Sequence, residues 1–329
     1  MRARALVAGV MLLATGCATA AVSPDAPAPA AGRSEDFLVV LARQGDTAER
    51  LAAQHLGDRS RAWMIEDYMG ARTFNAGQQV IIPLRPWNIT GVDATGYQIV
   101  PILCYHNLGP ESKGRLLLGA PQFEQQMRYL KEQGYRVVSM SQFIEWMQLK
   151  RQMPMRSVVL TFDDGYKAFK TYAQPILKEL GFTATLFVYT DYIGAGRNAL
   201  SWDELKTLAA EGVDVQAHSK SHGNLRRAQG ENDQQYSRRM EAELSEPLKQ
   251  FQRNLGRPVT LLAYPYGSTD DGVVAKVKEY GYMAAFTVRR QGSPVFVQTF
   301  RVNRSQVYSE MSLEEFAKNL NVFHQEDLR

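Results

Sequence analysis

The chain has 329 residues, a formal net charge of +4 and two cysteines. A charge this small, without a basic patch interleaved with aromatic residues, gives no indication of nucleic-acid binding, and no phosphate-binding glycine loop is present. Beyond the N-terminal segment that holds Cys17, the only cysteine is Cys104, so the sequence predicts no intramolecular disulfide and a fold that depends on its hydrophobic core.

The first 17 residues have the pattern of a secretory signal peptide. Two arginines precede an apolar run over residues 5–14, which is too short to span a membrane. The segment that ends at Cys17 resembles a bacterial lipobox, although Ala14 stands where leucine is more usual. The resemblance implies a lipidated Cys17 and a periplasmic chain, and Ala18 would favour the outer membrane; an ordinary secretory peptide is the alternative.

Two segments separate this signal from the longest part of the chain. Residues 18–36 are rich in alanine and proline, which predicts an extended tether. Residues 37–84 read as a small βααβ module that is similar to a LysM domain, with Gly-Asp-Thr before the first helix and GQQVIIP at the end. That family binds N-acetylglucosamine polymers. The asparagine usual in its second half has no match near Asp67, so a purely structural role is the alternative. Residues 85–96 are predicted to be a linker.

Residues 97–329 alternate strand-like and helical stretches, the pattern of a parallel sheet or barrel. Residues 157–162 have the composition of a strand buried on both faces, and they lead into Asp163 and Asp164. Consecutive strand residues point to opposite sides, so these carboxylates can serve different purposes. Two carboxylates at a buried strand end favour a bound cation or a shared proton; an ordinary Asp-Gly turn is the alternative.

A second strand-like run, residues 213–217, leads into His218 and His222. Histidines four residues apart share a face if the chain turns helical there. Two imidazoles and one carboxylate leave a coordination position open, as in catalytic zinc sites. The sequence therefore predicts a site for Zn²⁺ or another divalent transition metal, with a pair of surface histidines as the alternative.

The TFDDG segment at residues 161–165 and the HSKSH segment at residues 218–222 together resemble the motifs of the NodB-homology polysaccharide deacetylases, carbohydrate esterase family 4. The resemblance extends over about residues 99–316. It implies an α/β fold, a distorted (β/α) barrel, that removes acetyl groups from N-acetylated sugars with the help of a metal. Carried onto this sequence, the general base is Asp163, and the metal ligands are Asp164, His218 and His222.

The segment LLAYPYG at residues 261–267 aligns with the family's Arg-x-Pro-Tyr motif. The resemblance implies that the Tyr266 N–H stabilises the oxyanion of the reaction. Ala263, however, stands where the family has the arginine that orients the base. We expect Arg304 to supply that role, with Arg301 as the second candidate; both being ordinary surface residues is the alternative.

The family's late Leu-x-His acid has no counterpart after Tyr266. Residues 103–106, Leu-Cys-Tyr-His, resemble instead the early Tyr-His of the subgroup that deacetylates exported poly-N-acetylglucosamine. This implies His106 as the general acid, although a histidine at a barrel rim is often only a hydrogen-bonding residue. Tyr264 and Trp202 are expected to bind the glycan, with packing as the alternative for Trp202. The charged helical stretch over residues 231–255 is assigned no chemistry.

The predicted function is metal-dependent de-N-acetylation of an exported N-acetylglucosamine polymer, with the membrane and polysaccharide synthesis or export proteins as further partners. One alternative is a peptidoglycan deacetylase, which the LysM-like module favours. The other is a non-catalytic glycan-binding lipoprotein, which only the missing arginine at Ala263 supports.

Overall fold

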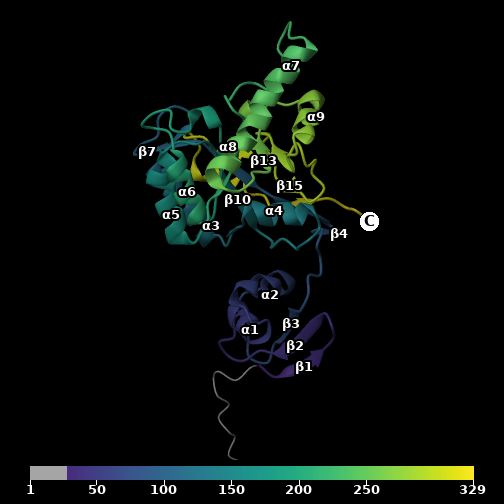
Figure 1. Cartoon of the computed structure of the whole chain (residues 1–329). Helices are drawn as coiled ribbons and strands as arrows, with labels where there is room; N and C mark the ends of the chain where they lie inside the picture. The colour runs from purple at the N-terminus through teal and green to yellow at the C-terminus, as the bar shows by residue number, and fades with distance from the viewer. Residues whose placement is uncertain (1–27) are drawn as a thin grey trace, which may run out of the picture. The chain divides into compact units, whose positions relative to one another are not determined.

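The computed structural model describes residues 28–329, which divide into two compact units between Leu84 and Arg85 (Figure 1). The predicted signal peptide, Cys17 and the first part of the predicted tether lie outside the described residues. No helix among residues 28–329 is both long and apolar enough to cross a membrane.

The smaller unit packs two helices and a short 3₁₀ turn against a three-stranded antiparallel sheet of order β1-β2-β3. Thr47 starts the first helix by accepting a hydrogen bond from the Arg50 N–H, as an N-cap residue does. Residues 30–33, which the sequence assigns to the tether, instead form an edge strand that pairs with β2. The elements are β1 (Ala30–Arg33), β2 (Phe37–Leu41), α1 (Ala48–His55), η1 (Arg59–Arg61), α2 (Ala62–Met69) and β3 (Gln79–Pro83).

The larger unit is built on a curled parallel sheet, so the expected α/β fold is confirmed. In the described chain its strand order is β14-β13-β12-β11-β10-β6-β16, with β9 beside β10. The strands are β6 (Ile102–Tyr105), β9 (Arg136–Val137), β10 (Ser157–Asp164), β11 (Thr185–Val188), β12 (Asp214–Ala217), β13 (Leu261–Ala263), β14 (Ala284–Phe286) and β16 (Ser305–Gln306). Smaller pairings involve β4 (Val92–Asp93), β5 (Gly96–Val100), β7 (Asn107–Gly109), β8 (Leu117–Gly119), β15 (Ser293–Pro294) and β17 (Phe323–Gln325).

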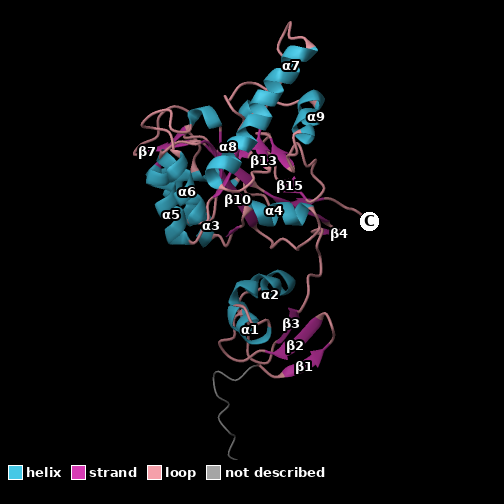
Figure 2. Ribbon diagram, in the orientation of Figure 1, coloured by secondary structure: helices cyan, strands magenta, loops and turns pink. Residues whose placement is uncertain are grey.

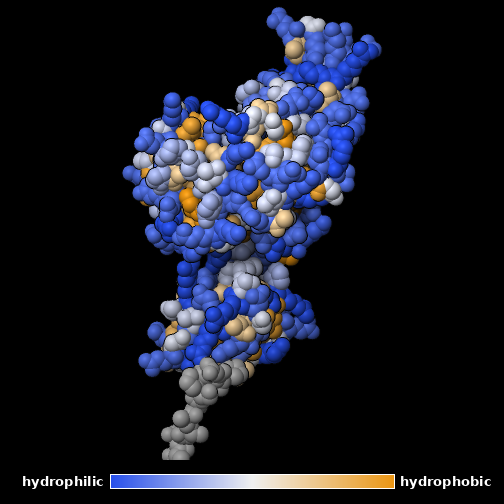
Figure 3. Space-filling model, turned by 60° about the vertical axis from the view of Figure 1, so that its left-hand side comes forward, coloured by the Kyte–Doolittle hydropathy of each residue, from blue (hydrophilic) through white to orange (hydrophobic). Residues whose placement is uncertain are grey.

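The helices of this unit lie around the outside of the sheet (Figure 2). They are α3 (Ala120–Glu132), α4 (Met140–Met147), α5 (Gln174–Leu180), α6 (Trp202–Ala210), α7 (Asp233–Met240), α8 (Glu246–Leu255), α9 (Asp271–Glu279) and α10 (Leu313–Ala317). A π-helical turn, η4 (Glu241–Ser245), joins α7 to α8. The surface in view is mainly hydrophilic, with hydrophobic residues singly or in small groups (Figure 3).

The segment around β16 contacts both edges of the curled sheet. Val302 forms a parallel bridge with Phe286 at the end of β14, while Ser305 and Gln306 pair with β6 at the other edge. Arg304 lies between these two contacts and is fully buried. The curl therefore brings a residue from the end of the chain against the strands at the centre of the sheet.

The alternation of side chains along β10 separates two hydrophobic cores. Val159 belongs to the core that includes Phe187 and Phe286, and Leu160 to the core that the outer helices cover. Thr161 and Asp163 follow Val159 on the same side of the strand. Because side chains alternate along a strand, Asp163 points to the inside of the curled sheet, where Arg304 lies.

Candidate active site

Asp163 and Arg304 form a fully buried ion pair at the end of β10. The two terminal nitrogens of the guanidinium donate hydrogen bonds of 2.7 Å to the two carboxylate oxygens, the bidentate geometry for which an arginine is suited. The Arg304 Nε–H donates to the carbonyl oxygen of Thr287 at 3.0 Å, and Nη1 lies 3.2 Å from the Thr161 hydroxyl. These bonds fix the plane of the Asp163 carboxylate.

The pKa of Asp163 reflects two opposing effects. Burial by itself would raise this pKa, since desolvation disfavours the charged form. The Arg304 guanidinium, with smaller contributions from His218 and His106, outweighs burial and holds the pKa of Asp163 well below its usual range. Asp163 is therefore an ionised carboxylate across the neutral range, able to accept a proton.

Asp164, His218 and His222 bring their ligand atoms within 4.8 Å of one another. Oδ1 of Asp164 lies 3.3 Å from Nε2 of His222 and 3.6 Å from Nε2 of His218. Neither contact is a hydrogen bond, because this buried oxygen has no hydrogen-bond partner among the described residues. Two ligands held by one zinc ion at about 2.1 Å in a tetrahedral arrangement lie about 3.4 Å apart, so these spacings suit a metal better than direct pairing.

The protonation states of these groups also fit a cation. Nδ1 of His218 lies 2.8 Å from the carbonyl oxygen of Ala263, which can only accept, so Nδ1 carries the proton and Nε2 keeps its lone pair. Burial lowers the pKa of His218 to about 4, outweighing the neighbouring Asp163, so the imidazole is neutral at pH 7. Burial, with the charge of Asp163, raises the pKa of Asp164 to about 6. A divalent ion would relieve that penalty.

The backbone has an unusual conformation at two of the predicted ligands and in the loop between the histidines. Asp164, Ser219 and His222 all have positive φ, at 77°, 68° and 62°, in a region that residues other than glycine rarely occupy. Gly165, at φ 88°, approaches Val188 so closely that a Cβ would lie 2.5 Å from its Cγ1. Surrounding contacts must therefore hold these conformations.

Glu243 supplies such contacts between the two histidines. Its buried carboxylate accepts hydrogen bonds from the Lys220 N–H at 3.1 Å, the Ser221 N–H at 3.0 Å and the Ser221 hydroxyl at 2.5 Å. The carboxylate comes from the π-helical turn η4, within the stretch to which the sequence assigns no chemistry. The structure adds a supporting contact for Glu243 that the sequence did not indicate. The sequence shows only a helical pattern in this stretch, and a π-turn changes which side chains face inward.

His106 follows β6 and stands beside the base. A ring nitrogen of His106, the Cys104 sulfur and a carboxylate oxygen of Asp163 all lie within 4.8 Å of one another. Nδ1 of His106 is buried without a hydrogen-bond partner among the described residues. The Cys104 thiol donates to Oδ2 of Asp163 at 3.4 Å, and burial raises its pKa well above the usual value, so Cys104 is a neutral donor and not a nucleophile.

Tyr266 lies beside His222, one of the predicted metal ligands. Its ring lies 4.7 Å from the ring of His222, and its side chain is 66 % exposed. Its backbone has φ 59°, and its N–H is paired with no acceptor of residues 28–329. A free N–H on a turn beside the ligands is able to donate to a negatively charged oxygen of a substrate.

Three predicted residues are not brought to this site. The Tyr264 side chain is buried and donates to the Phe300 carbonyl oxygen at 2.9 Å, so it is not available to a glycan. Trp202 packs edge-on against Phe251, the packing role left open above. Arg301, the second candidate for orienting the base, instead pairs with the exposed Asp271 at 2.6 Å.

Comparison with known proteins agrees with this geometry. Residues 150–285 match the family model described as polysaccharide deacetylase. The chain is 25% identical over 217 residues to the putative polysaccharide deacetylase YxkH of Bacillus subtilis (strain 168), covering 66% of this chain and 74% of that protein. It is 26% identical over 215 residues to the poly-beta-1,6-N-acetyl-D-glucosamine N-deacetylase of Staphylococcus aureus (strain MRSA252), covering 63% and 72%.

Two solved structures share the fold of the larger unit. The deacetylase PplD of Streptococcus pyogenes, in complex with acetate, has a TM-score of 0.62 at 24% identity and covers 69% of this chain and 100% of that one. IcaB from Ammonifex degensii has a TM-score of 0.60 at 24% identity and covers 68% and 98%. The matched family model and the curated relatives therefore make the larger unit similar to polysaccharide deacetylases.

Proposed function

We propose that this enzyme removes acetyl groups from N-acetylglucosamine units of a polysaccharide and requires a divalent ion, Zn²⁺ first, at Asp164, His218 and His222. The convergence of three ligand atoms, one of them a buried carboxylate oxygen without a hydrogen-bond partner, is the observation that carries this proposal. When bound, the ion would supply Lewis acidity toward water and toward the acetamide carbonyl.

The side chains around the ligands have distinct parts in the reaction. Asp163 accepts the proton of the attacking water, and Arg304 keeps its carboxylate ionised and oriented. Since the pKa of Asp163 is low, the carboxylate is an effective base only toward water that is itself made acidic. Asp163 would therefore act as a base only together with the proposed metal ion, which makes the attacking water more acidic.

The remaining roles concern the carbonyl and the leaving group. The Tyr266 N–H donates to the acetamide oxygen as that oxygen gains negative charge, a contribution of about 3 kcal/mol for a well-placed donor. His106 donates a proton to the sugar nitrogen as the C–N bond breaks. Water is consumed, and the products are acetate and a free amine on the polymer.

The names of the relatives support an N-acetylglucosamine polymer as the substrate, and we propose that this polymer is exported. The Staphylococcus aureus relatives are named for poly-β-1,6-N-acetyl-D-glucosamine. We extend that substrate class to this chain, with an N-terminal lipid on Cys17, a periplasmic location at the outer membrane, and synthesis or export proteins as partners. Peptidoglycan is the competing substrate.

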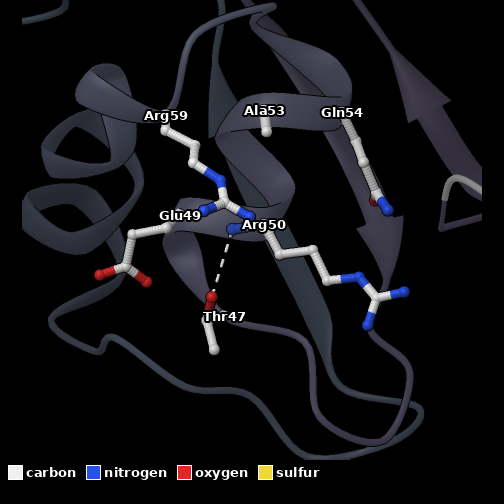
Figure 4. A pocket seen from close by; sticks show the side chains of 6 residues that line it. All are labelled: Thr47, Glu49, Arg50, Ala53, Gln54 and Arg59. Carbon is white, nitrogen blue, oxygen red and sulfur yellow. Dashed lines mark hydrogen bonds between the residues drawn. The ribbon is translucent and has the colours of Figure 1, made fainter. Parts of the chain in front are cut away.

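The smaller unit supports a glycan-binding role of its own, as a LysM-like module. It carries a cleft of about 720 Å³ along α1 and η1, lined by Thr47, Glu49, Arg50, Ala53, Gln54 and Arg59 (Figure 4). Polar side chains dominate this lining, and Oε1 of Gln54 has no hydrogen-bond partner among the described residues. Hydroxyl-rich sugars would satisfy such groups.

Acetate release from defined substrates tests the proposal. The full chain in detergent would be given β-1,6-linked N-acetylglucosamine oligomers and, separately, purified peptidoglycan. Metal-dependent acetate from the oligomers supports the exported polymer, and release from peptidoglycan alone moves the function to the cell wall. Glycan retention without acetate from either substrate would leave only a binding protein.

A further inference from the structure

A second cleft, of about 460 Å³, opens on the larger unit beside the active site. Its lining comes from the loops that follow β13 and β14 and from the segment before β16, and includes Gly267, Thr287, Arg289, Gln298, Arg301 and Asn303. Each loop is joined to the active site. Gly267 follows Tyr266, Thr287 accepts the hydrogen bond of Arg304 Nε, and Asn303 immediately precedes Arg304.

The loops that follow β13 and β14 approach each other closely at Gly267, the residue after Tyr266. A Cβ at Gly267 would lie 2.4 Å from Cγ2 of Val288, so only glycine permits this approach. Because Gly267 lines the cleft and Tyr266 contacts His222, a group bound in the cleft would lie near a substrate at Tyr266, as a neighbouring sugar of the same polymer would.

The lining is cationic and rich in hydrogen-bond donors. Arg289 is exposed and its guanidinium makes no hydrogen bond to the described residues. Arg301 pairs only with Asp271 and Gln298, and the Asp271 side chain is 97% exposed, so solvent screens that ion pair. Asn303 is 9% exposed; its backbone pairs with the Ser293 hydroxyl, and its side-chain amide makes no hydrogen bond within residues 28–329.

We propose that this cleft binds an anionic group of the substrate, a carboxylate or a phosphate carried by a sugar near the one that is deacetylated. Two guanidiniums and a buried amide form a donor set that suits such an oxyanion, whereas neutral N-acetylglucosamine needs no cation. The inference rests on the proposed deacetylation, and it favours a polymer in which anionic sugars accompany N-acetylglucosamine over the neutral homopolymer. The same charges repel glucosamine units that have already lost their acetyl groups.

Binding of inorganic phosphate to the chelator-treated full chain tests the cleft without catalysis. Calorimetry would compare the wild-type chain with the double variant Arg289→Gln, Arg301→Gln. Arg253→Gln, at an exposed position on α8, is the matched control. We expect the double variant to bind phosphate about tenfold or more weakly, as the loss of charge-assisted hydrogen bonds requires, and the control to bind as wild type does.

Kinetics on three glycans then identify the anion. The substrates are neutral N-acetylglucosamine oligomers, oligomers with a carboxylate on a neighbouring sugar, and oligomers with a phosphate there. We expect the double variant to lose kcat/KM about tenfold on one anionic class and to keep it on the neutral oligomers.

Two results would overturn the proposal: unchanged phosphate binding in the double variant, or an equal loss of kcat/KM on neutral and anionic substrates. Failure of the proposed function has a separate signature. In that case no glycan releases acetate, while phosphate binding still depends on Arg289 and Arg301.

Discussion

Arg304 and Asp163 face each other through two parallel hydrogen bonds of 2.7 Å, although 141 residues separate them along the chain. The motif position that would hold an orienting arginine is Ala263, a small buried residue of β13. The curl of the sheet brings Arg304, which directly precedes β16, to the carboxylate of Asp163. Orientation of the base therefore depends on the contact between the two edges of the sheet.

Replacing Arg304 by lysine should abolish most of the activity. Burial then acts on Asp163 without the guanidinium, so the pKa of the carboxyl rises and the acid limb of the kcat/KM profile moves to higher pH. Since general-base catalysis contributes about 10²–10⁴-fold, we expect a loss in that range at neutral pH. A pH–rate profile measures both effects.

The same substitution should also destabilise the fold, because a lysine ammonium cannot reproduce the two parallel hydrogen bonds; the loss should stay below about 3–5 kcal/mol, the cost of removing one partner of a buried ion pair. Arg301→Lys, at the exposed pair with Asp271, is the control and should leave stability and the pH profile unchanged. An unaltered acid limb in Arg304→Lys would contradict the assigned role.

Zinc binding should release a proton in mildly acidic solution. The pKa of Asp164 is raised to about 6 in the metal-free chain, whereas His218, with a pKa of about 4, is already neutral there. Protonated Asp164 stabilises the metal-free chain at low pH, and this contribution is lost as the pH rises through about 6. Above that pH the carboxylate is ionised and binds the metal without first losing a proton.

Calorimetry in buffers of different ionisation enthalpy counts these protons. We expect about one proton released near pH 5 and few near pH 7.5, with the low-pH release absent in Asp164→Asn. Asp203→Asn, an exposed substitution, should behave as wild type. Proton release that does not change with pH would argue against Asp164 as a ligand.

Glu243→Gln should weaken metal binding although Glu243 is not itself a ligand. Both carboxylate oxygens of Glu243 accept hydrogen bonds from this loop, whereas an uncharged amide has only one acceptor oxygen, so the loop between the histidines loses part of its support. Loss of such outer contacts typically lowers metal affinity about 10–100-fold. Glu241→Gln, on the exposed side of the same π-turn, is the control, and equal zinc affinity in the two variants would disprove the effect.

His106→Ala should slow amide hydrolysis more than hydrolysis of an activated ester. An amine must be protonated as it leaves, whereas 4-nitrophenolate leaves without help. We expect a loss of about 10²-fold or more on acetylated oligomers and a small change on 4-nitrophenyl acetate. Equal losses on both substrates would assign His106 to binding or folding instead.

Gly165→Ala should destabilise the chain more than Gly181→Ala does. Both glycines have positive φ, but only at Gly165 would a Cβ meet another side chain, Val188, while nothing lies within 4 Å at Gly181. The shared conformational cost is about 1–2 kcal/mol, so urea unfolding should show that loss at Gly181 and a larger one at Gly165.

The sequence predicted the features that depend on local pattern, such as the orientation of the two carboxylates at the end of β10. A buried strand that ends in two carboxylates predicts one of them inward and one outward, and the structure has Asp163 facing Arg304 and Asp164 facing the histidines. Arg304 was predicted only because Ala263 stands where the motif has an arginine. No sequence pattern around residue 304 indicates a contact with β10. That contact depends on the curl of the sheet.

Other features needed the packed structure. Tyr264 sits in a motif yet turns into the core, because alternation places its ring beneath the helices. The helix starting at Met140 is capped by Ser139, which forms a capping box with Gln142. Residues 30–33 lack strand propensity and pair only because β2 offers them an open edge.

Acetate release as a function of bound zinc tests the central claim most directly. The full chain, stripped with chelator and reloaded with known amounts of Zn²⁺, would be assayed on N-acetylglucosamine oligomers beside Asp163→Asn. We predict acetate in proportion to zinc up to one ion per chain, and none from Asp163→Asn although it still binds zinc. Acetate from the stripped chain, or undiminished release by Asp163→Asn, would contradict the account.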